Sequence, residues 1–308
     1  MIIISLVIGL FLLIQVFSWV SILTYSPKEI GRRSEYPKVS VLLAARNEEE
    51  LILRCLESMA QFNYPNDKLE ILIGDDASTD DTLKLVEAFI KDKPNFSVFS
   101  ISEIRGKGRG KANVLGQLAH KATGSFYFIT DVDVKLPKDW ILGLLQEFDS
   151  DVGIVSGTTM CDTGGFFATM QSLDWLHFMG YIKAFAHVGV GCTSVGNNMA
   201  VRAEAYWQTG GYEEIDFSIT EDYKLFQEVT SRKWKWRTIM SDYSLGRAWY
   251  ISNVKEMLHQ RKRWLIGARD LPFNWKAMIS LYGLFLPALS ILFFLSPILA
   301  MTVWLLKF

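Results

Sequence analysis

Two aspartates one residue apart, Asp131 and Asp133, follow a β-rich run and are the first candidates for chemistry. In an extended strand, side chains at positions i and i+2 leave the same face, so the two carboxylates would be able to share a divalent cation. Mg²⁺ or Mn²⁺ is the expected ion, because hard cations prefer oxygen ligands and bridge to a diphosphate. The alternative is a turn with two solvated acids, because Asp-x-Asp is a common pattern.

A third acidic position and a cationic aromatic segment follow the aspartate pair. Asp222, in Thr220-Glu221-Asp222, begins a predicted helix and is a candidate base, although the helix dipole alone favours acids there. In Gln260-Arg261-Lys262-Arg263-Trp264, Arg263 offers a planar fork for phosphate and Trp264 a flat face for a sugar or acceptor. A basic and aromatic belt beside a membrane is the other interpretation of this segment.

Polar loops follow two predicted strands. Ala45-Arg46-Asn47-Glu48 comes after the run 39–44, and Asp75-Asp76 comes after the buried run 69–74. The two aspartates are placed to accept hydrogen bonds from a base or ribose, whereas the acids after them can cap the next helix. Lys111 ends the segment 105–111, in which four cations alternate with three glycines. Such a loop either wraps phosphate oxygens or is a solvated basic turn.

The elements that position these residues alternate between strand and helix. Runs 39–44, 69–74 and 125–130 are rich in β-forming residues, and the helical pattern follows in 51–59 and 82–90. This alternation predicts an α/β fold, Rossmann-like, with a mostly parallel sheet and helices on both faces. Ligands bind such sheets beyond the carboxyl ends of the strands, which is where the polar loops fall.

Composition excludes several classes of protein. The formal net charge of -1 over 308 residues argues against a general nucleic-acid binder, so we expect no nucleic-acid partner. Cys55, Cys161 and Cys192 are widely spaced without a Cys-x-x-Cys pair. The sequence therefore predicts neither a zinc site nor a disulfide framework, in agreement with a reducing, cytosolic setting.

Apolar segments without charge stand at both ends of the chain. Residues 1–26 are long enough for a helix that crosses about 30 Å of hydrocarbon and are predicted to be a transmembrane anchor. Residues 277–306 form a second membrane segment, containing Pro287 and Pro297. An interfacial helix leading into a span, a kinked span and a re-entrant hairpin all fit its length.

The residues between these segments, 36–275, are predicted to be one catalytic domain. Its membrane-proximal flanks are basic and place it on the cytoplasmic side of a membrane, the inner or plasma membrane in a bacterium. The basic residues are Lys28, Arg32, Arg33, Arg261, Lys262, Arg263, Arg269 and Lys276. Within the domain, the aromatic stretch 166–188 is either an interface helix or a helix of the core.

The order of these motifs resembles that of membrane-bound family 2 glycosyltransferases with the GT-A fold, among them enzymes of the ceramide glucosyltransferase and the cellulose or hyaluronan synthase type. The resemblance covers about residues 37–275. It rests on Ala-Arg-Asn-Glu-Glu at 45–49, Gly-Asp-Asp-Ala-Ser-Thr-Asp-Asp-Thr at 74–82, Gly-Lys-Ala-Asn at 110–113, Thr-Asp-Val-Asp at 130–133, Thr-Glu-Asp at 220–222 and Gln-Arg-Lys-Arg-Trp at 260–264.

The resemblance implies a role for each position. Asp222 would be the general base of an inverting transfer, and Asp131 and Asp133 would hold the donor and its metal ion. The donor and nucleotide site would comprise Ala45, Arg46, Asn47, Glu48, Asp75, Asp76, Lys111, Asp131 and Asp133. The diphosphate and acceptor site would comprise Glu221, Gln260, Arg263 and Trp264.

The expected reaction is transfer of a sugar from a nucleotide sugar, a UDP-sugar, to a membrane lipid or a glycan. Two positions depart from the family pattern, because Ala77 replaces a frequent Gly and Gly116 a frequent Asn. The small number of apolar segments favours transfer of one or few sugars onto a lipid, unless the chain continues past Phe308. A processive polysaccharide synthase, a non-catalytic membrane scaffold and a phosphosugar or nucleotidyl transferase are the alternatives.

Overall fold

The computed structural model describes every residue except 1, 32–34, 163, 192 and 307–308. Arg32 and Arg33, two of the predicted flanking charges, and Cys192 therefore lie outside the described residues. The chain divides into two compact units. The sheet unit comprises Pro27–Met179 and Thr193–His259, and the helical unit comprises Met1–Ser26, Gly180–Cys192 and Gln260–Phe308. The division falls inside two helices, α6 (Phe166–His187) and α10 (Val254–Gly267).

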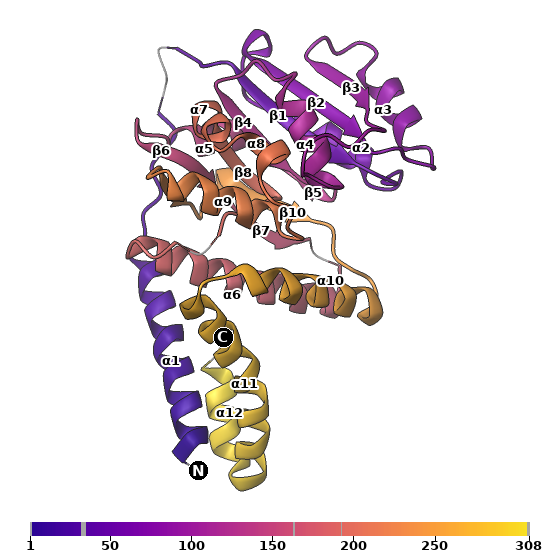
Figure 1. Cartoon of the computed structure of the whole chain (residues 1–308). Coiled ribbons are helices and arrows are strands. Elements are labelled where there is room, and N and C mark those ends of the chain that lie inside the picture. Colours follow the sequence, from indigo (N-terminus) through magenta and orange to yellow (C-terminus); the bar gives the residue numbers. More distant parts are fainter. Residues whose placement is uncertain (1, 32–34, 163, 192, 307–308) are drawn as a thin grey trace. The chain divides into compact units, whose positions relative to one another are not determined.

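A seven-stranded sheet in the order β3-β2-β1-β4-β8-β6-β9 forms the centre of the sheet unit (Figure 1). Its strands are β1 (Val39–Ala45), β2 (Leu69–Asp75), β3 (Phe96–Ser100), β4 (Phe126–Thr130), β6 (Val152–Ser156), β8 (Asn198–Arg202) and β9 (Lys235–Thr238). Only β8 runs opposite to the others, pairing antiparallel with β4 and β6. The predicted mostly parallel α/β sheet is confirmed.

Helices cover both faces of this sheet because strand side chains alternate between two apolar clusters. One cluster joins Val41 and Leu43 to the helices α2 (Ile52–Met59), α3 (Thr82–Ile90) and α5 (Trp140–Leu145). The other joins Leu42 and Leu72 to α4 (Lys111–Ala119), α7 (Ala203–Gln208), α8 (Gly211–Glu214) and α9 (Glu221–Ser231).

A smaller three-stranded sheet, which the sequence did not predict, has the order β5-β10-β7. Its strands are β5 (Val134–Lys135), β7 (Thr158–Cys161) and β10 (Leu245–Ala248). Short 3₁₀ helices occupy Asn66–Lys68, Asp242–Ser244 and Ala268–Asp270. The link from β4 to β5 contains the aspartate pair. It is a turn in which the Val134 amide donates to the Asp131 carbonyl at 3.2 Å, so the extended geometry expected there is wrong.

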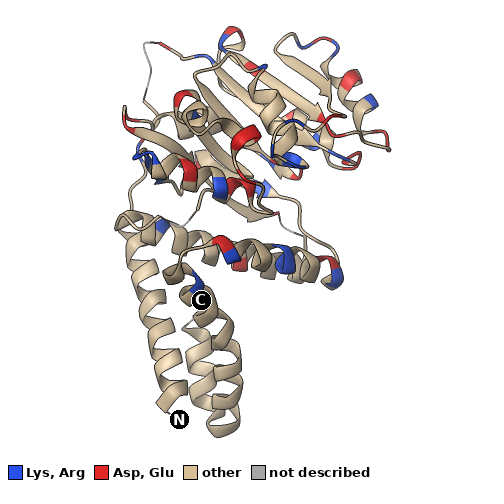
Figure 2. Ribbon diagram, viewed as in Figure 1, with Lys and Arg blue, Asp and Glu red and all other residues tan. Residues whose placement is uncertain are grey.

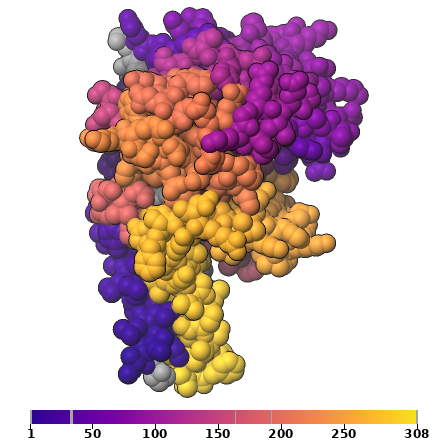
Figure 3. Space-filling model, in the orientation of Figure 1, coloured from indigo at the N-terminus to yellow at the C-terminus, as the bar shows by residue number. Residues whose placement is uncertain are grey.

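The helical unit pairs the two ends of the chain. Phe11 of α1 (Ile2–Leu23) stacks on Phe285 of α11 (Phe273–Leu295) with ring centroids 3.8 Å apart. Helix α12 (Pro297–Leu305) turns back, and its Val303 joins the same apolar cluster. Figure 3 shows α1 (indigo) beside the C-terminal helices (yellow), and the membrane topology of the segment 277–306 stays a prediction.

Two helices, α1 and α11, are long and apolar enough to cross a membrane by length and composition. Figure 2 shows α1 free of Lys, Arg, Asp and Glu along the residues described. One polar residue of α1 has a specific partner in this unit, because Gln15 is buried and its Oε1 accepts a hydrogen bond from the Tyr181 hydroxyl of α6 at 2.6 Å.

Candidate active site

Most of the predicted site residues meet at the carboxyl end of the seven-stranded sheet, the end at which its parallel strands finish. The loops after β1, β2 and β4 lie there, and so does the start of β8, because this strand runs in the opposite direction. The start of α9 is linked to the same place by a hydrogen bond between the Gly196 amide and Asp222 at 2.8 Å. This is the location that parallel sheets use for ligands.

The loops after β1 and β2 are joined by hydrogen bonds. The Asn47 amide donates to Ser78 Oγ at 3.0 Å and Asn47 Oδ1 accepts from the Thr79 amide at 2.8 Å. In the same pair of loops, the Arg46 guanidinium pairs with the Asp76 carboxylate at 3.3 Å. The structure therefore brings these predicted donor-binding residues together, with Asn47 already bonded within the loops.

Two residues of these loops have left-handed backbone geometry. Asn47 has φ 54° and Ala77 has φ 51°. Asparagine tolerates this region, whereas alanine is strained in it and glycine is not. A glycine at position 77 would therefore be less strained than Ala77.

The second departure, Gly116 in α4, lies where this helix packs against α8. A Cβ at this position would lie 3.4 Å from the Tyr212 Cβ and 3.4 Å from the Glu213 Cγ of α8. Both distances are ordinary van der Waals contacts, so α4 and α8 pack closely at this position.

Asp75 ends β2 with an available acceptor. The residue is buried, and its Oδ2 accepts a hydrogen bond from the Ser78 amide at 3.2 Å. Its Oδ1 is buried without a hydrogen-bond partner among the residues that the structure describes. Because an unmet buried acceptor costs about 1–3 kcal/mol, a hydrogen-bond donor from a ligand would be stabilising here.

Three carboxylates, Glu48, Asp131 and Asp133, repel one another at the ends of β1 and β4. Burial raises the pKa of Asp133 to about 7, with further contributions from Asp131 and Glu48. Burial also raises the pKa of Glu48 to about 7, helped by the charges of Asp131 and Asp80. The cluster thus holds negative charge that the protein alone leaves incompletely balanced.

The aspartate pair fits a divalent cation whose remaining ligands come from elsewhere. Among the described residues, no group of three or more His, Cys, Asp or Glu side chains is arranged to hold a metal ion. Mg²⁺ needs fewer, because proteins commonly bind it through one or two carboxylates together with waters and substrate phosphates. A positive ion between Asp131 and Asp133 would also offset the repulsion that raises the Asp133 pKa.

Lys111, the first residue of α4, connects this cluster to α9. Its Nζ lies 2.5 Å from Asp131 Oδ1, 3.0 Å from Glu221 Oε1 and 3.4 Å from the Gly196 carbonyl oxygen. Burial lowers its pKa, but the neighbouring carboxylates of Asp131 and Glu221 outweigh this and hold the pKa above its ordinary value. The ammonium group is therefore a fixed positive charge between two acidic side chains.

Two other cations of the loop 105–111 are bonded elsewhere. Lys107 Nζ pairs with Asp216 at 2.7 Å, and the Lys107 amide donates to the Glu213 carbonyl at 2.7 Å. The Arg109 guanidinium donates to the Gly108 carbonyl of its own loop at 2.7 Å. The loop is thus a turn fastened to α8, and Lys111 is the cation that it supplies to the site.

Asp222 lies half-buried at the start of α9. Its Oδ2 accepts from the Gly196 amide at 2.8 Å, and its Oδ1 accepts from the Tyr223 amide at 2.7 Å. Burial and the charge of Glu221 raise its pKa to about 6, while Lys111 and the two amides oppose the rise. At neutral pH the group is mostly ionised and still basic enough to take a proton.

Sequence reasoning missed Gly196, because a glycine supplies only its backbone. A Cβ there would lie 2.8 Å from the Asp222 Cβ and 3.0 Å from Asp222 Oδ2. No local pattern pairs residue 196 with residue 222, so the sequence offered no signal for this contact. The sequence also contains no sign of a role for Arg54, because it is a single charged residue in an apolar helical pattern. In the structure its guanidinium donates to the Asp133 carbonyl at 3.0 Å.

The third predicted motif lies in the helical unit. Gln260, Arg263 and Trp264 belong to the part of α10 assigned to that unit, where the Arg261 guanidinium lies 4.4 Å from the Trp264 ring centroid. Their roles toward a diphosphate or an acceptor stay predictions. A separate cavity of about 480 Å³ lies beside β3 and α4, and the described residues that line it, which include Arg105, are outside the predicted site.

The profile of glycosyl transferase family 21 matches residues 1–308. A β-monoglucosyldiacylglycerol synthase from Synechocystis sp. is 25% identical over 283 residues, which are 87% of this chain and 58% of the relative. A poly-β-1,6-N-acetyl-D-glucosamine synthase from Staphylococcus epidermidis is 23% identical over 252 residues, 78% of this chain and 57% of the relative. The chain thus spans little more than half the length of these curated relatives.

A solved structure has the same fold. The mannosyltransferase PcManGT from Pyrobaculum calidifontis, in complex with GDP-Man and Mn²⁺, matches with a TM-score of 0.67 and 20% identity over 100% of this chain and 91% of that one. These comparisons confirm the GT-A fold and the resemblance to family 2-like glycosyltransferases. The family whose profile matches is numbered 21.

Proposed function

Because the chain belongs to glycosyl transferase family 21, we propose that it transfers a sugar from a nucleoside diphosphate sugar, a UDP-sugar, to a lipid acceptor at a membrane, with inversion. The supporting observation is that one lysine, Lys111, touches both the aspartate turn and the start of α9. Its Nζ lies 2.5 Å from Asp131 and 3.0 Å from Glu221, the residue before Asp222. An acidic cation site and a basic carboxylate are thus adjacent.

In the proposed reaction Asp222 accepts the proton of an acceptor hydroxyl while that oxygen attacks the anomeric carbon and the nucleoside diphosphate leaves. A positioned base contributes about 10²- to 10⁴-fold in rate. Lys111 stabilises the charge that develops on the leaving phosphates. A Mg²⁺ or Mn²⁺ ion held by Asp131 and Asp133 would supply further stabilisation of the same charge.

The donor's nucleoside is assigned to the joined loops after β1 and β2. The free Oδ1 of Asp75 and the Arg46–Asp76 pair offer hydrogen bonds to a base or ribose. Ala45 and Asn47 shape the backbone there, and the Ala45 carbonyl accepts from the Asp76 amide at 2.8 Å. Glu48 belongs to the cation end of the same site. On the family resemblance alone, Glu221 of the sheet unit and Gln260, Arg263 and Trp264 of the helical unit are each proposed to act on the diphosphate or the acceptor.

A membrane lipid is the proposed acceptor because apolar helices flank the catalytic segment. Residues 1–26 and 277–306 are assigned to the membrane, residues 36–275 to the cytoplasmic side, and 166–188 to the interface. The names of the relatives, a glucosyldiacylglycerol synthase and a polysaccharide synthase, support a lipid or glycan acceptor. Both helices α1 and α11 have the length and composition that a span requires.

The decisive experiment measures release of nucleoside diphosphate from a panel of UDP- and GDP-sugars with a membrane lipid extract. The full chain, purified in nanodiscs, is compared with Asp222→Asn. We expect the variant to lose about 10²- to 10⁴-fold in rate. Removal of divalent ions with EDTA should abolish release in the native chain, and adding Mn²⁺ should restore it.

The matched control is Asp216→Asn. Asp216 is an exposed aspartate in the segment just before α9, and its ion-pair partner is Lys107 at 2.7 Å, which is not one of the proposed site residues. Its replacement should leave the rate within about twofold, since exposed ion pairs contribute little. An undiminished rate in Asp222→Asn would exclude this residue as the base. A product ladder in the mass spectrum, instead of one added sugar, would favour a processive polysaccharide synthase.

A further inference from the structure

We propose that Arg54 of α2 is a positioning residue that ties the Asp131–Asp133 turn to the small sheet β5-β10-β7 and to the exposed ring of Trp249. The inference rests on the proposed function for its meaning, because it concerns the turn assigned to the cation. It adds a residue that none of the sequence motifs contains.

The Arg54 guanidinium is the meeting point of three chain segments. Its Nη1 donates to the Asp133 carbonyl at 3.0 Å. Its Nη2 donates to the Arg247 carbonyl of β10 at 3.1 Å and to the Asp162 carboxylate after β7 at 2.6 Å. These partners are 79, 193 and 108 residues away in the chain, so one side chain fixes a junction that no local bond can fix.

The Asp133 carbonyl is held from two directions. In addition to Arg54, the Trp249 amide donates to this oxygen at 2.8 Å. The peptide bond between Asp133 and Val134 therefore has a fixed position at the end of the turn. Outer partners of this kind orient metal ligands, and their removal typically weakens metal binding by about 10- to 100-fold.

The same guanidinium also fixes an aromatic side chain. The Arg54 Cζ lies 5.4 Å from the Trp249 ring centroid, a distance at which a cation is attracted to an aromatic face. Trp249 remains 45% exposed and stacks on Tyr250, with ring planes 18° apart. Arg54 thus contacts both the turn and the exposed Trp249 ring, and so fixes their positions relative to each other.

An arginine is needed for this arrangement because its planar fork carries five donors in fixed directions. A lysine in its place would keep the charge and reach one or two of the three oxygens. The substitution Arg54→Lys therefore separates the role of the fork from the role of the charge.

The chain offers a matched control in Arg202 at the end of β8. This guanidinium also donates to two backbone carbonyls, those of Val152 at 3.1 Å and Asp149 at 2.7 Å. It also lies over an aromatic ring, 5.7 Å from the Trp234 centroid. The chemistry matches that of Arg54, but Arg202 lies at the other end of the sheet, where the parallel strands begin.

The test uses the full chain in nanodiscs with Arg54→Lys and Arg202→Lys. Hydrogen–deuterium exchange is followed for peptides covering residues 131–135 and 245–250, and Mn²⁺ alone is titrated by electron paramagnetic resonance. For Arg54→Lys we expect exchange in these two segments to accelerate about tenfold and the Kd for Mn²⁺ to rise about 10- to 100-fold. Arg202→Lys should accelerate exchange around residues 149–152 and leave the Kd for Mn²⁺ unchanged.

Two results would overturn the inference. One is unchanged exchange in residues 131–135 and 245–250 of Arg54→Lys. The other is the same loss of protection throughout the sheet in both variants, which would make Arg54 a general stabilising residue. The exchange experiment needs no substrate and no metal ion. Failure of the native chain to transfer any sugar would therefore count against the proposed function alone, and the exchange data would still decide the role of Arg54.

Discussion

Glu70 and Glu48, at opposite ends of the seven-stranded sheet, differ in how the protein treats a partly buried carboxylate. Glu70, near the start of β2, accepts hydrogen bonds from Ser40 Oγ at 2.6 Å and from the Thr123 amide at 2.6 Å. Burial raises its pKa, but these bonds and Lys38 outweigh burial and hold the pKa below its ordinary value. Glu48, at the carboxyl end, has a pKa raised to about 7.

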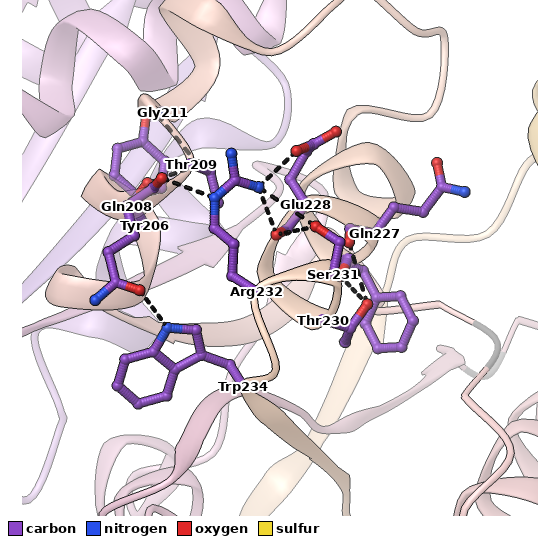
Figure 4. A network of polar contacts seen from close by, with 11 residues as sticks. Tyr206, Gln208, Thr209, Gly211, Gln227, Glu228, Thr230, Ser231, Arg232 and Trp234 are labelled. Carbon is purple, nitrogen blue, oxygen red and sulfur yellow. Dashed lines mark hydrogen bonds and ion pairs between the residues drawn. The ribbon is translucent and has the colours of Figure 1, made fainter.

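Other groups at the amino end, where the parallel strands begin, are also well paired. Figure 4 shows Arg232, after α9, donating to the Gln208 carbonyl at 2.8 Å and to the Glu228 carboxylate at 2.6 Å. In the same network the Trp234 indole donates to Gln208 Oε1 at 2.8 Å. Arg232 and the Trp234 indole thus find partners within the protein.

The difference shows where the fold is stabilised and where it is left incomplete. At the amino end the charges of Glu70 and Arg232 are paired, whereas the carboxyl end retains the repelling acids Glu48, Asp131 and Asp133 and, among the described residues, the unpaired Asp75 Oδ1. Functional sites commonly deviate from the rules that the rest of a protein obeys. Changes at the carboxyl end should therefore alter activity, and equivalent changes at the amino end should alter stability.

The largest expected effect comes from Gly196→Ala. The added Cβ would lie 2.8 Å from the Asp222 Cβ and must displace the proposed base. A misplacement of about 1 Å can cost about 10²-fold in rate, so we expect kcat to fall by at least that factor. The measurement is nucleoside diphosphate release, together with the melting temperature in nanodiscs.

The matched variant at the amino end is Gly124→Ala. Its Cβ would lie 2.6 Å from the Ser40 amide nitrogen, a backbone atom next to the Glu70 network. We expect a loss of about 1–3 kcal/mol in stability, because overpacking forces the backbone to shift, with kcat of the folded fraction unchanged. If both variants lose only stability, Gly196 has no special relation to the active carboxylate.

The next effect is the pH dependence of the rate. Burial and Glu221 raise the Asp222 pKa to about 6, so the ionised base is mostly present at pH 7 and mostly protonated at pH 5. The titration of Asp222 alone should lower kcat/KM roughly tenfold over that interval, whereas an ordinary aspartate at this position would contribute almost no change. In Glu221→Gln the inflection should move to lower pH. An unmoved inflection would show that another group controls the profile.

The sequence predicts those parts of this contrast that depend on residues close together in the chain. The strands at 39–44 and 69–74 and the helix that begins at Glu221 follow from local apolar runs and periodicity. The acids Asp131 and Asp222 were found for the same reason, since they directly follow or begin such elements. Asp131 and the loops after 39–44 and 69–74 are expected to lie close together because the carboxyl ends of parallel strands, where ligands bind, meet at one edge of the sheet.

Features that depend on contacts between distant segments were not predictable. Asn198 is one: its side chain accepts from the Trp140 indole at 2.8 Å and donates to the Thr158 and Ser244 carbonyls at 2.8 Å. The reversed strand β8 that contains it has no sequence signal separating it from a parallel strand. The turn at 131–133 was only the alternative interpretation, because the spacing Asp-x-Asp fits both an extended strand and a turn.

A smaller effect is expected for the two glutamates. Glu48→Gln removes a charge whose folded-state pKa lies above the unfolded value. Because solvent screens this partly exposed group, the gain in stability at pH 8 should be only about 1–2 kcal/mol. Glu70→Gln removes a well-bonded charge and should lower stability by about 1–3 kcal/mol. Melting temperatures of the native chain and both variants at pH 8 provide the measurement.

The pH dependence of stability gives each glutamate an independent check. Glu48 binds its proton more tightly in the folded protein, so stability should rise as pH falls from about 7 toward 4.5, and Glu48→Gln should weaken that rise. Glu70 binds its proton less tightly when folded, so its contribution is present above the unfolded pKa and is lost as pH falls through the folded one. Equal behaviour of the two variants would contradict the contrast between the ends.

The smallest expected effect concerns backbone strain, which occurs at both ends. Ala77, at the carboxyl end, has φ 51°, and Lys233, at the amino end, has φ 68°. Replacing either by glycine relieves about 1–2 kcal/mol of strain and loses about 0.4–1 kcal/mol through the more flexible unfolded chain. We expect a net gain below about 1 kcal/mol for each, read as a small rise in melting temperature, with the KM for the donor unchanged.

Equal gains in the two variants would show that strain does not distinguish the two ends of the sheet, and that unbalanced charge does. A higher KM in Ala77→Gly alone would mean that the strained loop helps to hold the donor.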